Sequence, residues 1–135
     1  MINTKIIKLA SNSKFAGLKN IFTHKSTMKN TLCGDFIKIE VIADKKRIKS
    51  MRYEVESCIL CEASASLLAQ KIKNLEIKYL KSIINILNNQ NKKDEINFSH
   101  KFKSFNLLLN KSTKSRANCV ILPIEALLKA FKISQ

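Results

Sequence analysis

Two alternating segments separated by three residues place the strongest constraint on how this chain folds. Residues 36–43 (FIKIEVIA) and 47–55 (RIKSMRYEV) are rich in β-branched side chains and alternate partly at a period of two. Such a pattern is typical of half-buried strands. Because only Asp44-Lys45-Lys46 joins the two segments, we predict a β-hairpin.

Helical patterns lie on both sides of the hairpin. Residues 61–73 combine Leu67, Leu68 and Ile72 with alanines and serines, and these small side chains permit close packing against a sheet. In the last predicted helix, Pro123 is expected in the first turn, where its missing N–H does no harm. The other predicted segments are helices over 2–10, 75–88 and 115–133, a short helix within 98–110, a packed loop over 11–30 and a polar surface connection over 88–97.

Length and apolar content favour one domain over residues 1–135. Of the 135 residues, 45% are hydrophobic, which is enough for one core. No apolar run approaches the length of a membrane-spanning helix. The first residues resemble a short amphipathic helix rather than a signal peptide, so we expect a cytoplasmic protein.

The net charge of +15 raises the question of nucleic-acid binding. The basic residues are 22 Lys but only three Arg, and Lys, Ile and Asn together fill 53 of 135 positions. AT-rich codons produce this composition without selection for binding. The lysines are spread along the chain with no aromatic stacking motif or zinc-finger spacing around them. A basic nucleic-acid-binding module therefore remains only a minor alternative.

Four cysteines carry the functional signal: Cys33, Cys58, Cys61 and Cys119. In a reducing cytoplasm, cysteines serve as metal ligands or sulfur carriers more often than as disulfides, and a buried core position is the alternative for each. Three of them fall at predicted element ends. Cys33 precedes the first strand, Cys58 lies between strand and helix, and Cys119 enters the last helix, whose dipole favours a thiolate.

Three motifs in combination resemble a known family. They are Cys33-Gly34-Asp35 before the hairpin, Ser57-Cys58 before the Ala-Ser-rich helix, and 116–123 (RANCVILP) at the last helix. Together they resemble the NifU/IscU/SufU iron–sulfur assembly proteins over about residues 4–131. The separations of 25 and 61 residues between successive motif cysteines resemble the longer SufU-like arrangement, with an insertion near residues 88–100.

The resemblance implies an α+β fold with a small antiparallel sheet of about three strands and helices packed on it. It also implies a site formed by Cys33, Asp35, Cys58 and Cys119. These residues would bind a transient Fe–S cluster, 2Fe–2S by preference, or alternatively zinc. By the same resemblance, Cys119 accepts persulfide sulfur and Arg116 assists that transfer. The implied partners are a cysteine desulfurase and recipient apo-proteins, and a homodimer is left open.

Two functions remain open on these residues, a cluster scaffold and a zinc-dependent sulfurtransferase. IscU-type members have a histidine directly before the last cysteine, where this chain has Asn118, and the usual glycine before the middle cysteine is replaced by Ser57. Cys61 forms a C-x-x-C with Cys58. Cys61 could act as a reserve cluster ligand or as a resolving thiol for a persulfide. Alternatively, it packs in the core as a small hydrophobe, and we favour this second interpretation.

Overall fold

The predicted hairpin forms two of the three strands of an antiparallel sheet in the computed structural model, which describes residues 4–30, 34–88, 105, 108 and 117–132. Strands β2 (Asp35–Ala43) and β3 (Ile48–Glu56) pair antiparallel, with Ile39 opposite Tyr53. Both side chains are buried. The alternation of β-branched residues therefore identified this hairpin correctly.

A third strand, β1 (His24–Asn30), completes the sheet in the order β1-β2-β3. It lies within residues 11–30, where we predicted a loop, and that prediction was wrong. The only large aliphatic side chain of β1 is that of Met28, which packs against the core. The strand is held instead by its ladder with β2 and by the Ser26 hydroxyl, which donates a hydrogen bond to the Ala126 carbonyl. Apolar alternation is therefore too weak to reveal it.

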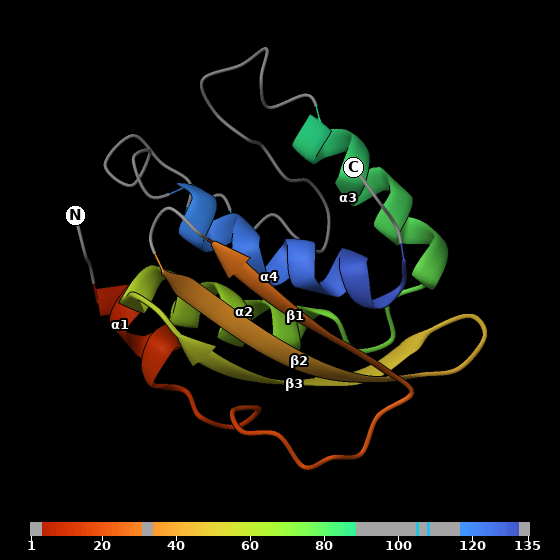
Figure 1. The fold of residues 1–135 in the computed structure, drawn as a ribbon, viewed down its shortest axis with the longest axis horizontal. Coiled ribbons are helices and arrows are strands. Elements are labelled where there is room, and N and C mark those ends of the chain that lie inside the picture. Colours follow the sequence, from red (N-terminus) through yellow and green to blue (C-terminus); the bar gives the residue numbers. More distant parts are fainter. Residues whose placement is uncertain (1–3, 31–33, 89–104, 106–107, 109–116, 133–135) are drawn as a thin grey trace.

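Two helices pack against the sheet on one side (Figure 1). Helix α2 (Ile59–Lys71) contacts β3, whereas α4 (Ala117–Ala130) contacts β1, β2 and α2. Between the helices, the buried Ser64 hydroxyl donates a hydrogen bond to the Val120 carbonyl. The small side chains of α2 thus allow the close packing that the sequence predicted.

The last helix is confirmed within the described part of residues 115–133, but the position of Pro123 is corrected. Because α4 already begins at Ala117, Pro123 lies inside the helix and beyond its first turn. A proline there cannot donate the usual backbone hydrogen bond to the carbonyl four residues earlier, that of Cys119. Nearly every side chain of α4 from Cys119 to Ala130 is buried, so α4 is a central helix of the fold.

The remaining elements agree with their predicted types. Helix α1 (Thr4–Ser11) contacts α2, and the predicted helix over 75–88 begins with a short 3-10 turn, η1 (Ile77–Tyr79), before α3 (Leu80–Asn88). The predicted helix within 98–110 lies outside the described residues, except for Phe105 and Leu108, which are buried. The polar connection also lies outside them from residue 89 onward. Among the described helices, none is long and apolar enough to span a membrane.

Candidate functional site

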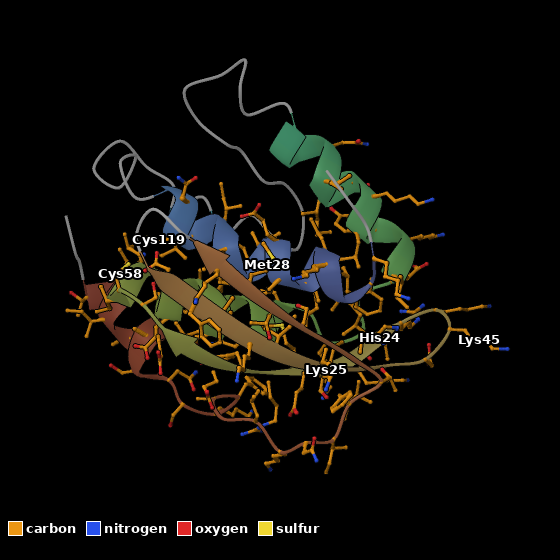
Figure 2. The ribbon with its side chains drawn as sticks, viewed as in Figure 1. His24, Lys25, Met28, Lys45, Cys58 and Cys119 are labelled. Atoms are coloured by element: carbon orange, nitrogen blue, oxygen red, sulfur yellow. The ribbon has the colours of Figure 1, made fainter. Side chains whose placement is uncertain are left out.

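One end of the sheet gathers the residues that the sequence singled out. Asp35 opens β2, and the end of β3 lies beside it because Phe36 pairs with Glu56. Cys58 follows β3 at the start of α2, and α4 contributes Cys119 from its first turn. Figure 2 shows Cys58 and Cys119 near each other at this end of the molecule. The antiparallel topology therefore brings together residues from distant parts of the chain.

Asp35 and Cys119 are in direct contact. The Cys119 thiol donates a hydrogen bond to Asp35 Oδ2 over 3.0 Å, although the two residues are 84 positions apart. Asp35 is 5% exposed and Cys119 is 4% exposed. Both side chains are therefore shielded from water and face each other. The carboxylate oxygen is a hard ligand atom and the thiol sulfur is a soft one.

Gly34 sets the direction in which β2 and Asp35 begin. Its φ of 72° lies in the left-handed region, which glycine adopts without steric cost. A glycine in the left-handed conformation therefore directly precedes the first hairpin strand. The third motif residue, Cys33, lies outside the described residues.

Cys58 is the N-cap residue of α2. Its backbone is extended, with φ −74° and ψ 167°, and its carbonyl accepts the N–H groups of Cys61 and Glu62 at 3.1 and 3.2 Å. The side chain makes no capping hydrogen bond to the helix. It is half-buried and hydrogen-bonds with Cys119. Cys58 therefore joins the Asp35–Cys119 pair, with its backbone fixed by the helix start.

Burial dominates the electrostatics of Cys119. Desolvation raises the pKa of its thiol well above the ordinary value of 9.0, and the hydrogen bonds with Asp35 and Cys58 raise it further. The α4 dipole was predicted to favour a thiolate at Cys119, which would lower this pKa. The pKa is raised instead, because desolvation and the neighbouring acidic groups outweigh the dipole. Binding a metal ion at this thiol must therefore displace a firmly held proton.

Cys61 belongs to the hydrophobic core. Cys61 is fully buried and belongs to the cluster of apolar side chains that forms the core. Burial raises the pKa of the Cys61 thiol from 9.0 to about 12, against a smaller opposing effect of the Ser57 hydroxyl. A fully buried neutral thiol of this kind packs as a small hydrophobe, which supports the packing alternative over the reserve-ligand one.

The remaining predicted site residue, Arg116, lies outside the described residues. Of the two histidines, neither of which was predicted as a ligand, His100 also lies outside them. Asn118 is exposed on the first turn of α4. His24 lies far along β1 from Cys119 in Figure 2, and its ring stacks on Phe131 with 4.2 Å between centroids. Neither His24 nor Asn118 is therefore part of the contact at Asp35.

The metal-binding arrangement is incomplete within the described residues. There, no three His, Cys, Asp or Glu side chains form a group that could hold a metal ion. The contact that exists joins Asp35 to Cys119, with Cys58 beside Cys119. One residue that packs α2 against α4 was not anticipated individually, namely Ser64, whose hydroxyl donates a hydrogen bond to the Val120 carbonyl. The Ala-Ser repeat of α2 was its only sequence signal.

The fold and the site define a class of small α+β proteins that carry thiols and a carboxylate at one end of an antiparallel sheet. Residues 1–99 match the family model described as the NifU-like N terminal domain, and the chain belongs to this family. This confirms the resemblance drawn from the three motifs.

Individual relatives agree with this assignment. The chain is 28% identical over 134 residues to the iron–sulfur cluster assembly scaffold protein IscU of Thermotoga maritima, covering 98% of this chain and 93% of that protein. Two solved structures share the fold. One is a nitrogen-fixing NifU-like protein (N-terminal) from Brucella abortus, with a TM-score of 0.83 and 17% sequence identity; the match covers 96% of this chain and 91% of that chain. The other is a putative iron–sulfur cluster assembly scaffold protein for the SUF system from Fervidobacterium islandicum, with a TM-score of 0.79 and 22% sequence identity; the match covers 97% of this chain and 96% of that chain. The predicted α+β fold with a three-stranded sheet is thereby confirmed.

Proposed function

We propose that this protein is an iron–sulfur cluster assembly scaffold. It receives sulfur from a cysteine desulfurase, binds iron, builds a transient 2Fe–2S cluster and passes it to recipient apo-proteins. The ligands are Cys33, Asp35, Cys58 and Cys119. The observation that carries the proposal is the buried Asp35–Cys119 contact with Cys58 beside it, in a chain that belongs to the NifU-like N terminal domain family.

The donor set suits a cargo that must be released. Thiolates are soft ligands that hold iron and sulfide firmly, whereas a carboxylate is a harder and weaker ligand for the same cluster. Asp35 is therefore the ligand that leaves first when a recipient takes the cluster. Its burial keeps water from competing for the site while the cluster is being built.

Sulfur enters through Cys119 in this proposal. Cys119 gives up its proton and attacks the outer sulfur of a desulfurase persulfide as the thiolate. A new S–S bond forms on Cys119, the old one breaks, and the desulfurase thiolate leaves and takes up a proton, so that the exchange is balanced. This exchange is redox-neutral. Conversion of the transferred sulfur to sulfide takes two electrons from an external electron donor. The positive charge of Arg116 attracts the anionic persulfide.

A zinc-dependent sulfurtransferase is the second candidate. Three thiolates and one carboxylate also suit tetrahedral zinc. At position 118, where a histidine would add a further ligand, this chain has an asparagine.

In either function, we propose that residues 1–135 act as a single domain in the cytoplasm. The single buried core of the described residues supports one domain.

The ligand assignment is tested with Cys58→Ser and Cys119→Ser, using Cys61→Ala as the matched control. Each protein is reconstituted without oxygen with ferrous iron, cysteine and a cysteine desulfurase, and bound iron and sulfide are measured. We expect the first two variants to lose the cluster and Cys61→Ala to retain it, because Cys61 is a core residue. Equal iron and sulfide binding by Cys119→Ser and the original protein would refute the assignment.

A further inference from the structure

The Ser57 hydroxyl is buried without a hydrogen-bond partner among the described residues. Ser57 lies between the end of β3 and Cys58. A hydroxyl group removed from water normally finds a donor or acceptor, and one that does not is explained by strain or by a group that the structure does not contain. Its position next to a proposed ligand favours the second explanation.

The surroundings of Ser57 connect it to the site. Its hydroxyl lies near enough to the Cys61 thiol to lower the pKa of that thiol, yet the two groups do not meet the distance and angle limits of a hydrogen bond. The charges of Asp35 and Cys58 raise the pKa of the same thiol. Ser57 therefore directly precedes a proposed ligand in the chain and lies close to the Cys61 thiol, and its hydroxyl makes no hydrogen bond among the described residues.

We propose that the Ser57 hydroxyl donates a hydrogen bond to sulfur of the bound cluster, either to the Cys58 thiolate or to the sulfide next to it. This inference rests on the proposed scaffold function. Sulfur atoms of a bound cluster carry negative charge and accept hydrogen bonds, and such bonds tune how tightly a metal centre is held and its potential. Ser57 is thus a positioning residue, because it acts through the sulfur ligands and does not bind iron itself.

Two consequences distinguish this role from a purely structural one. A hydrogen bond to sulfur stabilises the more negative, reduced cluster more than the oxidised one, so it raises the reduction potential. It also slows cluster loss. Because the hydroxyl has no partner among the described residues, removing it should not destabilise the cluster-free protein.

The experiment compares Ser57→Ala and Ser57→Thr with Ser64→Ala as the matched control. Ser64 is a buried serine of α2 whose hydroxyl already donates to Val120. For Ser57→Ala we expect a more negative cluster potential, cluster release about 10-fold faster, and unchanged urea unfolding of the cluster-free protein. Ser57→Thr, which keeps the hydroxyl, should restore potential and release. Ser64→Ala should lower stability and leave the potential unchanged.

The outcomes separate this inference from the function on which it rests. If the original protein assembles a cluster and Ser57→Ala matches it in potential and release rate, the inference is wrong and the scaffold function stands. If Ser57→Ala loses stability as Ser64→Ala does, the hydroxyl is structural and the inference is also wrong. If the original protein binds no iron and sulfide, the scaffold function fails and the inference fails with it.

Discussion

Replacing Asp35 by Asn should make Cys119 markedly more reactive in the metal-free protein. Asp35 Oδ2 accepts a hydrogen bond from the Cys119 thiol over 3.0 Å, and both residues are buried. This contact stabilises the protonated thiol and is one of the causes that raise its pKa. Asn is nearly the same size as Asp but carries no charge, so the substitution removes the negative charge that favours the protonated thiol while preserving the packing.

The size of the effect follows from the hydrogen bond. Hydrogen bonds to charged groups contribute about 1.5–3 kcal/mol, and about 1.4 kcal/mol corresponds to a tenfold change in a protonation equilibrium. Asp35→Asn should therefore lower the pKa of Cys119 and increase its thiolate fraction about 10- to 100-fold at a fixed pH between 8 and 10. Burial still acts on the thiol, so its pKa does not fall below that of an exposed cysteine.

The assay is the rate of iodoacetamide alkylation at each cysteine, followed by mass spectrometry across this pH range. Glu40→Gln is the matched control. Glu40 is also a buried carboxylate of β2, but its Oε1 accepts the backbone N–H groups of Lys19 and Asn20 at 2.9 and 3.0 Å. It should leave the Cys119 rate unchanged. An unchanged or slower Cys119 rate in Asp35→Asn would show that the contact does not control this thiol.

Three further predictions follow from named contacts. Gly34→Ala should lower the free energy of unfolding in urea by about 1–2 kcal/mol, because its φ of 72° strains any side chain while no atom lies within 4 Å of the added Cβ; unchanged stability would contradict the strained turn. The neutral Cys61 thiol, whose pKa is raised from 9.0 to about 12, stabilises the fold below pH 9. That contribution, at most about 4 kcal/mol, should be lost as pH rises from 9 to 12, and the stability of Cys61→Ala should lack this pH-dependent component. Because Cys119 holds its proton firmly, zinc affinity measured by chelator competition should rise with pH between 6 and 9, and a flat profile would exclude deprotonation of this thiol on binding.

The elements with strong local patterns could be predicted from the sequence. The hairpin over residues 36–55 combines β-branched alternation with a short connection, and α2 combines leucines with small residues. β1 could not be predicted, because an edge strand held by its ladder and by Ser26 needs little apolar alternation. Pro123 was expected in the first turn of the last helix, but α4 already begins at Ala117, so Pro123 lies inside the helix.

The site was predictable in its residues but not in its electrostatics. Motif spacing identified Asp35, Cys58 and Cys119, and the antiparallel topology brings them to one end of the sheet. The helix dipole suggested a thiolate at Cys119, yet burial raises its pKa, because desolvation depends on packing that no local pattern encodes. The unpartnered hydroxyl of Ser57 is likewise visible only in the folded chain.

Transient cluster assembly is tested most directly by native mass spectrometry of protein purified without oxygen. The protein is measured as isolated, after addition of a cysteine desulfurase, cysteine and ferrous iron, and again after addition of an apo-ferredoxin. The scaffold account predicts that the chain gains the mass of a 2Fe–2S cluster and that this mass then moves to the ferredoxin. A chain that retains one zinc ion and acquires neither iron nor sulfide would contradict it and favour the sulfurtransferase.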